Sequence, residues 1–238
     1  MPIISRIGSR FIKKNVSQSA PPVGYTLTQG IKAPVGSAGM TSFNTNATTG
    51  STDDGFSTRA LPFNVNFYGT SYSTAYVGTN TYITFNAGST NYNSLALGPT
   101  PNPALPTIHL GSADNSSQTS YFLTGTNFFR LRYEGWNTTS LSGTQIIYEV
   151  RFFRQVNASD DIFIELVFGT HGQTGGIWGI TNGVTPSTFT SFAALTVPQG
   201  NVGSTSALAQ NKSYVIILNS NGAFKNLYSG YYVSSVVT

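Results

Sequence analysis

From residue 56 onward, short runs of alternating apolar and polar residues are separated by clusters of turn-forming residues. In the run PFNVNF, for example, Phe63, Val65 and Phe67 fall on one face of an extended chain, and two asparagines fall on the other. A period of two indicates a strand with one buried face, and clusters of Gly, Asn, Ser and Thr indicate turns. No helical periodicity stands out after residue 20. The pattern therefore predicts an all-β fold.

Runs of this kind recur at the spacing that is typical of a β-sandwich or jelly roll. The candidate strands are Phe63–Phe67, Ala75–Val77, Tyr82–Phe85, Thr107–Leu110, Ser120–Leu123, Phe128–Glu134, Gln145–Arg154, Ile162–Phe168, Ile177–Thr181, Ser191–Leu195, Ser213–Leu218 and Tyr231–Val237. A chain of 238 residues is long enough to bury a core without disulfides, and this one has no Cys. We expect an antiparallel β-sandwich or jelly roll with an extended N-terminal arm.

The run Gln145–Arg154 has apolar residues on both of its faces. One face carries Ile146, Tyr148, Val150 and Phe152, and the other carries Ile147, Glu149, Arg151 and Phe153. The first face is predicted to lie in the core, and the mixed second face is a candidate interface. Three glutamates lie in predicted strands, where pairing with arginines of neighbouring strands is expected. The glutamates are Glu134, Glu149 and Glu165, and the arginines are Arg132, Arg151 and Arg154.

The positive charge of the chain is concentrated near its N-terminus. The net charge is +4, yet residues 1–40 hold five cations and no acid, and the remainder is nearly neutral. A nearly neutral body argues against nucleic-acid binding. We divide the chain into a basic docking arm (1–20), a linker or irregular wrap rich in Gly, Pro, Ser and Thr (21–55), and a β-sandwich domain (56–238). The wrap is predicted to hold one short strand near Tyr25–Leu27.

The arm interleaves apolar and basic residues. These are Ile3, Ile4, Arg6, Ile7, Arg10, Phe11, Lys13 and Lys14. The spacing fits a short amphipathic helix, although Pro2 and Gly8 make an extended arm equally compatible with it. So short a segment does not fold alone, and we expect it to dock on a partner protein. No apolar stretch of the chain suits a membrane helix or a secretory signal, which predicts synthesis in the cytoplasm without membrane insertion.

The chain offers few residues for catalysis. His109 lies in an apolar run and is expected to be a strand residue, and His171 lies in a Gly-rich loop. No Gly-x-Ser-x-Gly elbow accompanies them, and Gly169–Gly176 lacks the Lys-Ser/Thr of a phosphate-binding loop. The pairs Asp53–Asp54 and Asp160–Asp161 do not follow the calcium-loop spacing and are expected to be solvated turn residues, with metal binding left open. We predict no enzyme, no cofactor and no catalytic residue.

Aromatic residues in polar loops raise the alternative of glycan recognition. Sugars are bound by stacking on aromatic rings and by hydrogen bonds, and Asn and Thr are abundant here. Most aromatic side chains must lie in the core. The candidates for glycan contact are Tyr92, Trp136, His171 and Trp178.

Residues 62–85, PFNVNFYGTSYSTAYVGTNTYITF, resemble a β-sandwich pattern of nidogen-like extracellular modules and of tailed-phage structural proteins. Gly69 is expected to provide a turn conformation that other residues resist. The likeness continues more weakly at Leu105–Leu110 with Asp114, which look like the next strand and an acidic loop. It also extends to residues 129–136, 147–168 and 177–183. One departure is Asn80-Thr81, where the pattern usually has Asn-Gly.

The resemblance, the basic arm and the neutral body together predict a non-enzymatic virion structural protein of a bacteriophage. The arm would bind other virion proteins, and the sandwich would be displayed on the virion surface as a capsid decoration protein or a tail or fibre component. A homo-oligomer, a trimer by analogy, is expected. The alternative is a carbohydrate-binding adhesion module that recognises a cell-surface glycan.

Overall fold

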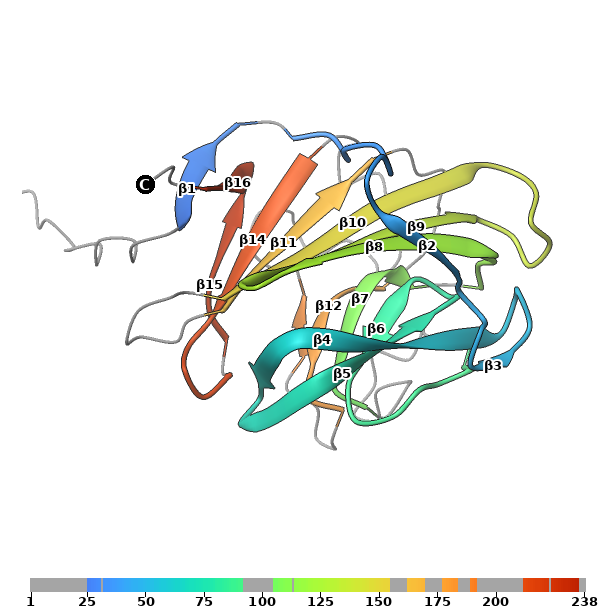
Figure 1. The fold of residues 1–238 in the computed structure, drawn as a ribbon, viewed down its shortest axis with the longest axis horizontal. Helices are drawn as coiled ribbons and strands as arrows, with labels where there is room; N and C mark the ends of the chain where they lie inside the picture. The colour runs from blue at the N-terminus through green and yellow to red at the C-terminus, as the bar shows by residue number, and fades with distance from the viewer. Residues whose placement is uncertain are drawn as a thin grey trace, which may run out of the picture.

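The computed structural model describes residues 25–30, 32–91, 105–112, 114–154, 162–169, 177–183, 189–191, 212–222 and 224–235. Two antiparallel seven-stranded sheets face each other, and a two-stranded ribbon lies outside them (Figure 1). The predicted antiparallel β-sandwich is therefore confirmed. The described residues contain no helix that is long and apolar enough to cross a membrane. The predicted docking arm lies outside them.

The first sheet, called sheet I below, has the strand order β15-β14-β11-β10-β9-β8-β2. Its strands are β2 (Thr41–Asn44), β8 (Thr119–Gly125), β9 (Phe128–Trp136), β10 (Gln145–Arg154), β11 (Ile162–Phe168), β14 (Lys212–Leu218) and β15 (Phe224–Ser229). Strands β10 and β11 have the predicted bounds. The sequence pattern did not reveal the edge strands β2 and β15, because edge strands such as TSFN are short and largely polar.

The second sheet, sheet II, has the order β13-β12-β7-β6-β5-β4-β3. Its strands are β3 (Thr49–Gly50), β4 (Gly55–Phe67), β5 (Thr70–Gly78), β6 (Tyr82–Thr84), β7 (Thr107–Ser112), β12 (Ile177–Thr181) and β13 (Phe189–Ser191). A two-residue turn joins β4 to β5. Its residues Tyr68 and Gly69 have φ angles of +49° and +82°, the left-handed geometry that such hairpins favour. The turn predicted at Gly69 is present.

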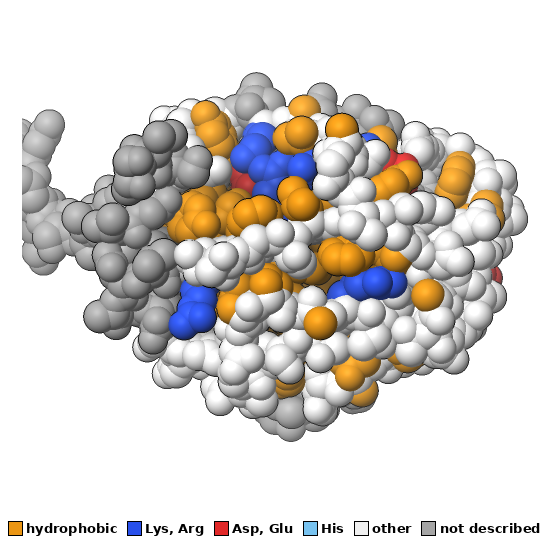
Figure 2. Space-filling model, viewed as in Figure 1, with side chains coloured by type: hydrophobic (Ala, Val, Ile, Leu, Met, Phe, Trp, Pro, Cys, Tyr) orange, Lys and Arg blue, Asp and Glu red, His pale blue; other side chains and the backbone are white. Residues whose placement is uncertain are grey.

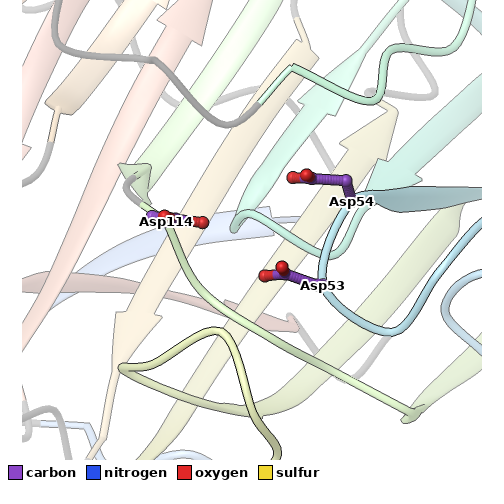
Figure 3. Close-up of side chains that lie close together, drawn as sticks. All are labelled: Asp53, Asp54 and Asp114. Carbon is purple, nitrogen blue, oxygen red and sulfur yellow. The ribbon is translucent and has the colours of Figure 1, made fainter.

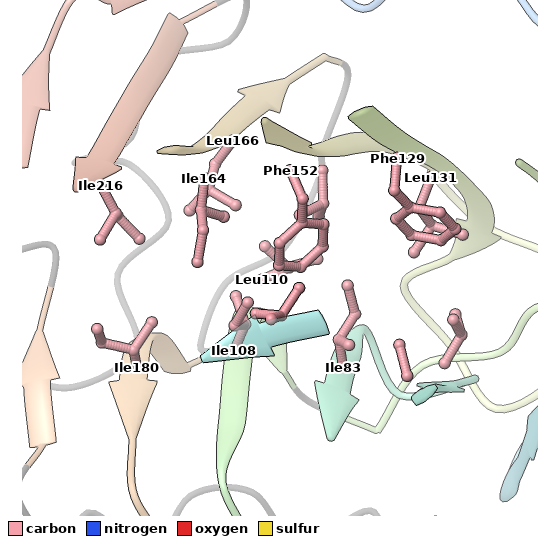
Figure 4. Packing of buried hydrophobic residues seen from close by; sticks show 14 of the residues in the cluster. Ile83, Ile108, Leu110, Phe129, Leu131, Phe152, Ile164, Leu166, Ile180 and Ile216 are labelled. Atoms are coloured by element: carbon pink, nitrogen blue, oxygen red, sulfur yellow. The ribbon is translucent and has the colours of Figure 1, made fainter. Parts of the chain in front are cut away.

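The main hydrophobic core lies between the two sheets. Figure 4 shows Phe152 and Ile164 of sheet I facing Ile108 of sheet II. The inner face of β10 is fully buried in this core, as predicted: the side chains of Ile146, Tyr148, Val150 and Phe152 belong to it. Period-two alternation thus assigned the correct face of this strand to the core.

The ribbon joins the two ends of the described chain. Strand β1 (Tyr25–Gln29) pairs antiparallel with β16 (Tyr231–Ser235), and Tyr25 lies opposite Ser235. A second, smaller core forms where the ribbon packs on sheet I. It contains Phe163, Val215, Ile217 and Val233, with Tyr25, Leu27, Phe153, Tyr228 and Tyr231 packed against them. The outer face of sheet I is therefore covered by the protein's own chain ends.

Residues 32–36, called the strap below, cross the outer face of sheet I between the ribbon and β2 (Figure 1). The strap contacts β11 through Lys32, whose Nζ lies 3.2 Å from Oε1 of Glu165. It contacts β9 through the carbonyl oxygen of Val35, which accepts hydrogen bonds from Arg130 (2.7 Å) and Arg132 (2.9 Å). The described residues of the predicted linker or wrap therefore supply β1 of the ribbon, the strap, β2 of sheet I and β3 of sheet II.

Candidate functional site

Three carboxylates lie together in the loops at the end of the molecule that carries β3, opposite the ribbon (Figures 1 and 3). One carboxylate oxygen from each of Asp53, Asp54 and Asp114 lies within 4.8 Å of the others. These residues, called the acidic group below, come from the β3–β4 turn and the β7–β8 connection. Carboxylate oxygens are the ligands that a hard cation such as Ca²⁺ takes, although such an ion binds about six to eight oxygens.

The electrostatics of the acidic group follow from partial burial and from mutual repulsion. Partial burial raises the pKa of Asp53, and the carboxylates of Asp54 and Asp114 raise it further. Partial burial also raises the pKa of Asp114, with an added contribution from Asp54. Oδ1 of Asp53 is buried and accepts no hydrogen bond. Ser51 Oγ accepts hydrogen bonds from the backbone amides of Asp53 and Asp54, so this acidic pair does lie in a turn.

A buried polar network holds the loops of the acidic group in place. Asn80 Nδ2 donates to Oδ1 of Asp54 (2.9 Å), and Asn80 Oδ1 accepts from the backbone amide of Asn115 (2.8 Å). Thr81 has a φ of +57°, the left-handed conformation that a glycine would adopt at low cost. Its Oγ1 accepts from Asn115 Nδ2 (2.7 Å) and donates to the carbonyl of Gly111 (3.0 Å). The departure from Asn-Gly thus gains hydrogen bonds that tie the loop of Asp114 to the β5–β6 turn.

Of the predicted glycan contacts, Trp136 is the one whose surroundings the structure describes. It is half-buried at the end of β9, and its backbone exchanges two hydrogen bonds (2.8 and 3.1 Å) with Ser116. Trp136 therefore lies at the same end of the molecule as the acidic group. Trp178 lies in β12, but the structure describes only its backbone. Tyr92, His171 and the pair Asp160–Asp161 lie outside the described residues.

His109 is a strand residue, as predicted. It lies in β7 between Tyr82 of β6 and Gly179 of β12 and is 2% exposed. Burial lowers the pKa of His109 to about 3, so its imidazole is neutral at physiological pH. A side chain this deeply buried does not reach a substrate at the surface.

The outer face of sheet I carries a second concentration of charge, the ion network, which comprises Lys32, Arg130, Arg132, Glu134, Glu149, Arg151 and Glu165. Glu149 and Glu165 are fully buried. Glu149 pairs with Arg130 and Arg151, both at 2.5 Å, and Arg151 also pairs with Glu165 at 3.0 Å. Figure 2 shows a compact group of Lys and Arg side chains bordered by apolar ones where the strap crosses.

The expected pairing of strand glutamates with arginines is confirmed for Arg132 and Arg151. Sequence reasoning missed Arg130 and Lys32 as partners. Arg130 follows the same alternation on β9 as Arg132, so the period of two could have revealed it. Lys32 gave no signal, because it lies in the wrap and meets Glu165 across 133 residues of chain. The mixed face of β10 is covered within the protein itself: Phe153 packs against Tyr25 of the ribbon, and Glu149 and Arg151 join the ion network that the strap contacts.

The protein is thus a β-sandwich module in which Arg130, Arg132 and Glu165 of sheet I hold the strap and β16. A family model described as NIDO related matches residues 24–223, and the chain belongs to this family. The match begins one residue before β1 and agrees with the nidogen-like resemblance of residues 62–85. No curated protein and no solved structure matches the chain.

Proposed function

We propose that this protein is a non-enzymatic structural component of a virion, as in tailed bacteriophages. Its N-terminal arm, residues 1–20, anchors it to other virion proteins, and its β-sandwich is displayed on the particle surface. It serves as a capsid decoration protein or as a tail or fibre component, and it assembles as a homo-oligomer. The nidogen-like resemblance and the basic arm support this proposal.

The observation that carries the proposal is that the N-terminal strand and a group of loops lie at opposite ends of the molecule. The first described strand, β1, lies at one end of the molecule, and β3 and the β9–β10 connection lie at the opposite end (Figure 1). A body that is anchored through the residues before Tyr25 would therefore present the loops 51–54, 114–118 and 137–144 outward. Loops on a rigid scaffold are the usual place for recognition.

An anchored arm must also be joined firmly to the body that it holds. Here the first described strand pairs with β16, and the strap that follows is fixed by an ion pair and by arginine hydrogen bonds to the Val35 carbonyl. A load on the first described strand therefore reaches sheet I through several contacts of the strap. This arrangement suits an anchor better than a loose tether would.

The titratable strand residues of the described chain favour a role without catalysis. His109 is buried and neutral, and the carboxylates of Glu149 and Glu165 are buried in ion pairs with arginines. General acid–base catalysis needs a titratable group within hydrogen-bond reach of a substrate, which these residues do not offer.

Deletion of residues 1–20 tests the proposal. The shortened chain is expected to keep the circular dichroism spectrum and thermal transition of the whole protein, because β1 and the strap remain. Its copy number in purified particles, measured by mass spectrometry, is expected to fall to background. A folded deletion variant that is incorporated at the normal level would exclude the anchoring role.

The second candidate function is a carbohydrate-binding adhesion module. The observation that favours it is the position of half-buried Trp136 at the loop end beside the acidic group. Glycan-array binding that Trp136→Ala removes would support this reading. Tyr121→Ala is the matched control, because it truncates a half-buried aromatic residue of the neighbouring strand β8. Equal binding by both variants would place the glycan elsewhere.

A further inference from the structure

The carboxylate of Glu165 is reached by donors from both ends of the described chain. Glu165 is fully buried in β11. Its Oε1 accepts from Nζ of Lys32, in the strap, at 3.2 Å and from the backbone amide of Val233, in β16, at 3.2 Å. Its Oε2 accepts from Arg151 at 3.0 Å. One oxygen atom is therefore shared by the N-terminal segment and the C-terminal strand.

The two ends also depend on each other for their backbone pairing. Within the described part of the chain, β1 pairs with β16 and with no other strand. An isolated two-stranded ribbon is marginally stable in water and needs a packing surface. The ribbon gains that surface from the second core, to which β16 contributes Val233 and β1 contributes Tyr25 and Leu27. Removing either strand leaves the other without the partner that pairs with its backbone.

The strap continues this mutual dependence toward β9. The Val35 carbonyl accepts from Arg130 and Arg132, and both arginines pair with Glu149. Lys32 binds Glu165, which Arg151 connects to the same Glu149. Substitutions within one buried charge network have coupled effects on stability, because removing one partner leaves another charge buried without a partner.

We propose that β1, the strap and β16 form one cooperative latch across the outer face of sheet I. The latch closes when both chain ends are in place, and it opens as a unit. The stability of the N-terminal segment is therefore set by residues more than 200 positions away: the Thr26 and Ser234 hydroxyls meet across 208 residues. Capture of the residues before Tyr25 by a partner would be transmitted to the C-terminal strand. The proposal holds whatever those residues bind.

Hydrogen exchange measured by mass spectrometry on the full chain tests this coupling through Glu165→Gln. The variant keeps the shape of the side chain but lacks its charge. It is expected to speed amide exchange in both 25–36 and 231–235 by about tenfold or more, which corresponds to about 1.4 kcal/mol, a typical cost of weakening a buried charged hydrogen bond. Exchange that rises at one end alone would overturn the proposal. Glu134→Gln is the matched control, because the Glu134 side chain is 23% exposed and accepts its hydrogen bond from Arg132 rather than from Lys32 or the Val233 amide.

A covalent lock provides a second test, because it adds a bond between the two chain ends. The chain has no Cys, so Thr26→Cys with Ser234→Cys introduces a single cysteine pair. These residues are register partners whose hydroxyl oxygens lie 2.7 Å apart. Oxidation is expected to slow amide exchange in the strap as well as in β1 and β16, and reduction is expected to restore it. An oxidised protein whose strap exchanges at the reduced rate would show that the ends open independently. The Thr26→Cys single variant controls for the substitution itself.

Discussion

The two faces of β10 are both buried, but one is apolar and the other carries paired charges. Its inner face places Ile146, Tyr148, Val150 and Phe152 in the main core, where shape and apolar area provide the stability. Its outer face places Glu149 and Arg151 under the strap, where each buried charge needs a partner. An apolar face tolerates any neighbour of suitable shape, whereas a charged face requires particular partners at particular positions. The charged face therefore selects which segment covers it.

The inner face gives the largest expected effect. Phe152→Ala is expected to lower the free energy of unfolding by about 4 kcal/mol, because it removes a fully buried ring and leaves a cavity. Its ring contacts Phe129 and Phe85 at centroid distances of 5.9 and 6.4 Å, so both sheets lose a neighbour. Guanidinium denaturation measures the change. A loss of less than about 1 kcal/mol, a quarter of that expected for a core phenylalanine, would mean that this part of the core collapses around the gap.

The outer face is expected to respond nearly as strongly to the loss of one charge. Glu149→Gln is expected to cost about 3 kcal/mol, because it removes the buried anion that Arg130, Arg132 and Arg151 share. Glu134→Gln is the control: its side chain is 23% exposed and pairs with Arg132, so a loss of about 0–1 kcal/mol is expected. The same denaturation experiment compares them. Equal losses for both variants would remove the distinction between buried and surface pairs on this face.

His109 of sheet II is buried as a neutral side chain, in contrast to the paired charges on the outer face of sheet I. Burial lowers the pKa of His109 in the folded protein from 6.5 to about 3. Between these two pH values, the imidazole is therefore protonated in the unfolded chain and neutral in the folded one. Stability from this residue is complete above pH 6.5 and is lost as the pH falls toward 3. At pH 4.5 the loss is expected to be about 2–3 kcal/mol. Denaturation midpoints of the wild type and of His109→Gln, measured from pH 4 to 8, give the part of the pH dependence that comes from His109. If the midpoints of the two proteins fell by the same amount at low pH, the prediction would be contradicted.

The smallest effect is expected at the acidic group, where like charges lie together near solvent. Asp114→Asn in a chelating buffer is expected to stabilise the protein by a few tenths to about 0.5 kcal/mol, because it removes repulsion that solvent largely screens. Differential scanning calorimetry measures the shift. Repeating the scan with calcium chloride tests for a bound cation, which would stabilise the wild type and leave Asp114→Asn unchanged. Destabilisation by Asp114→Asn in chelator would contradict the repulsion argument.

The acidic group illustrates what sequence reasoning could not reach. Asp53–Asp54 and Asp114 were each visible as acidic loop residues, but nothing local indicated that the β3–β4 turn lies against the β7–β8 connection. The two loops are held together by Asn80, which bonds both Asp54 and Asn115, and by the backbone hydrogen bond that the Ser117 amide donates to Thr52. Thr81 likewise looked like a simple departure from Asn-Gly, and only its contacts with Asn115 and Gly111 explain why a threonine is held at positive φ.

The sequence by itself determined the β class, the sandwich and the buried face of β10, because the period of two is a local property of an extended chain. It also determined that the other face of β10 is mixed and that the glutamates of β9, β10 and β11 need partners. Only the tertiary structure decided which partners Glu165 has: Lys32 comes to it across 133 residues, and the amide of Val233 comes to it across 68. Partners so distant are fixed by how the sheets and chain ends pack, and no local pattern encodes that choice.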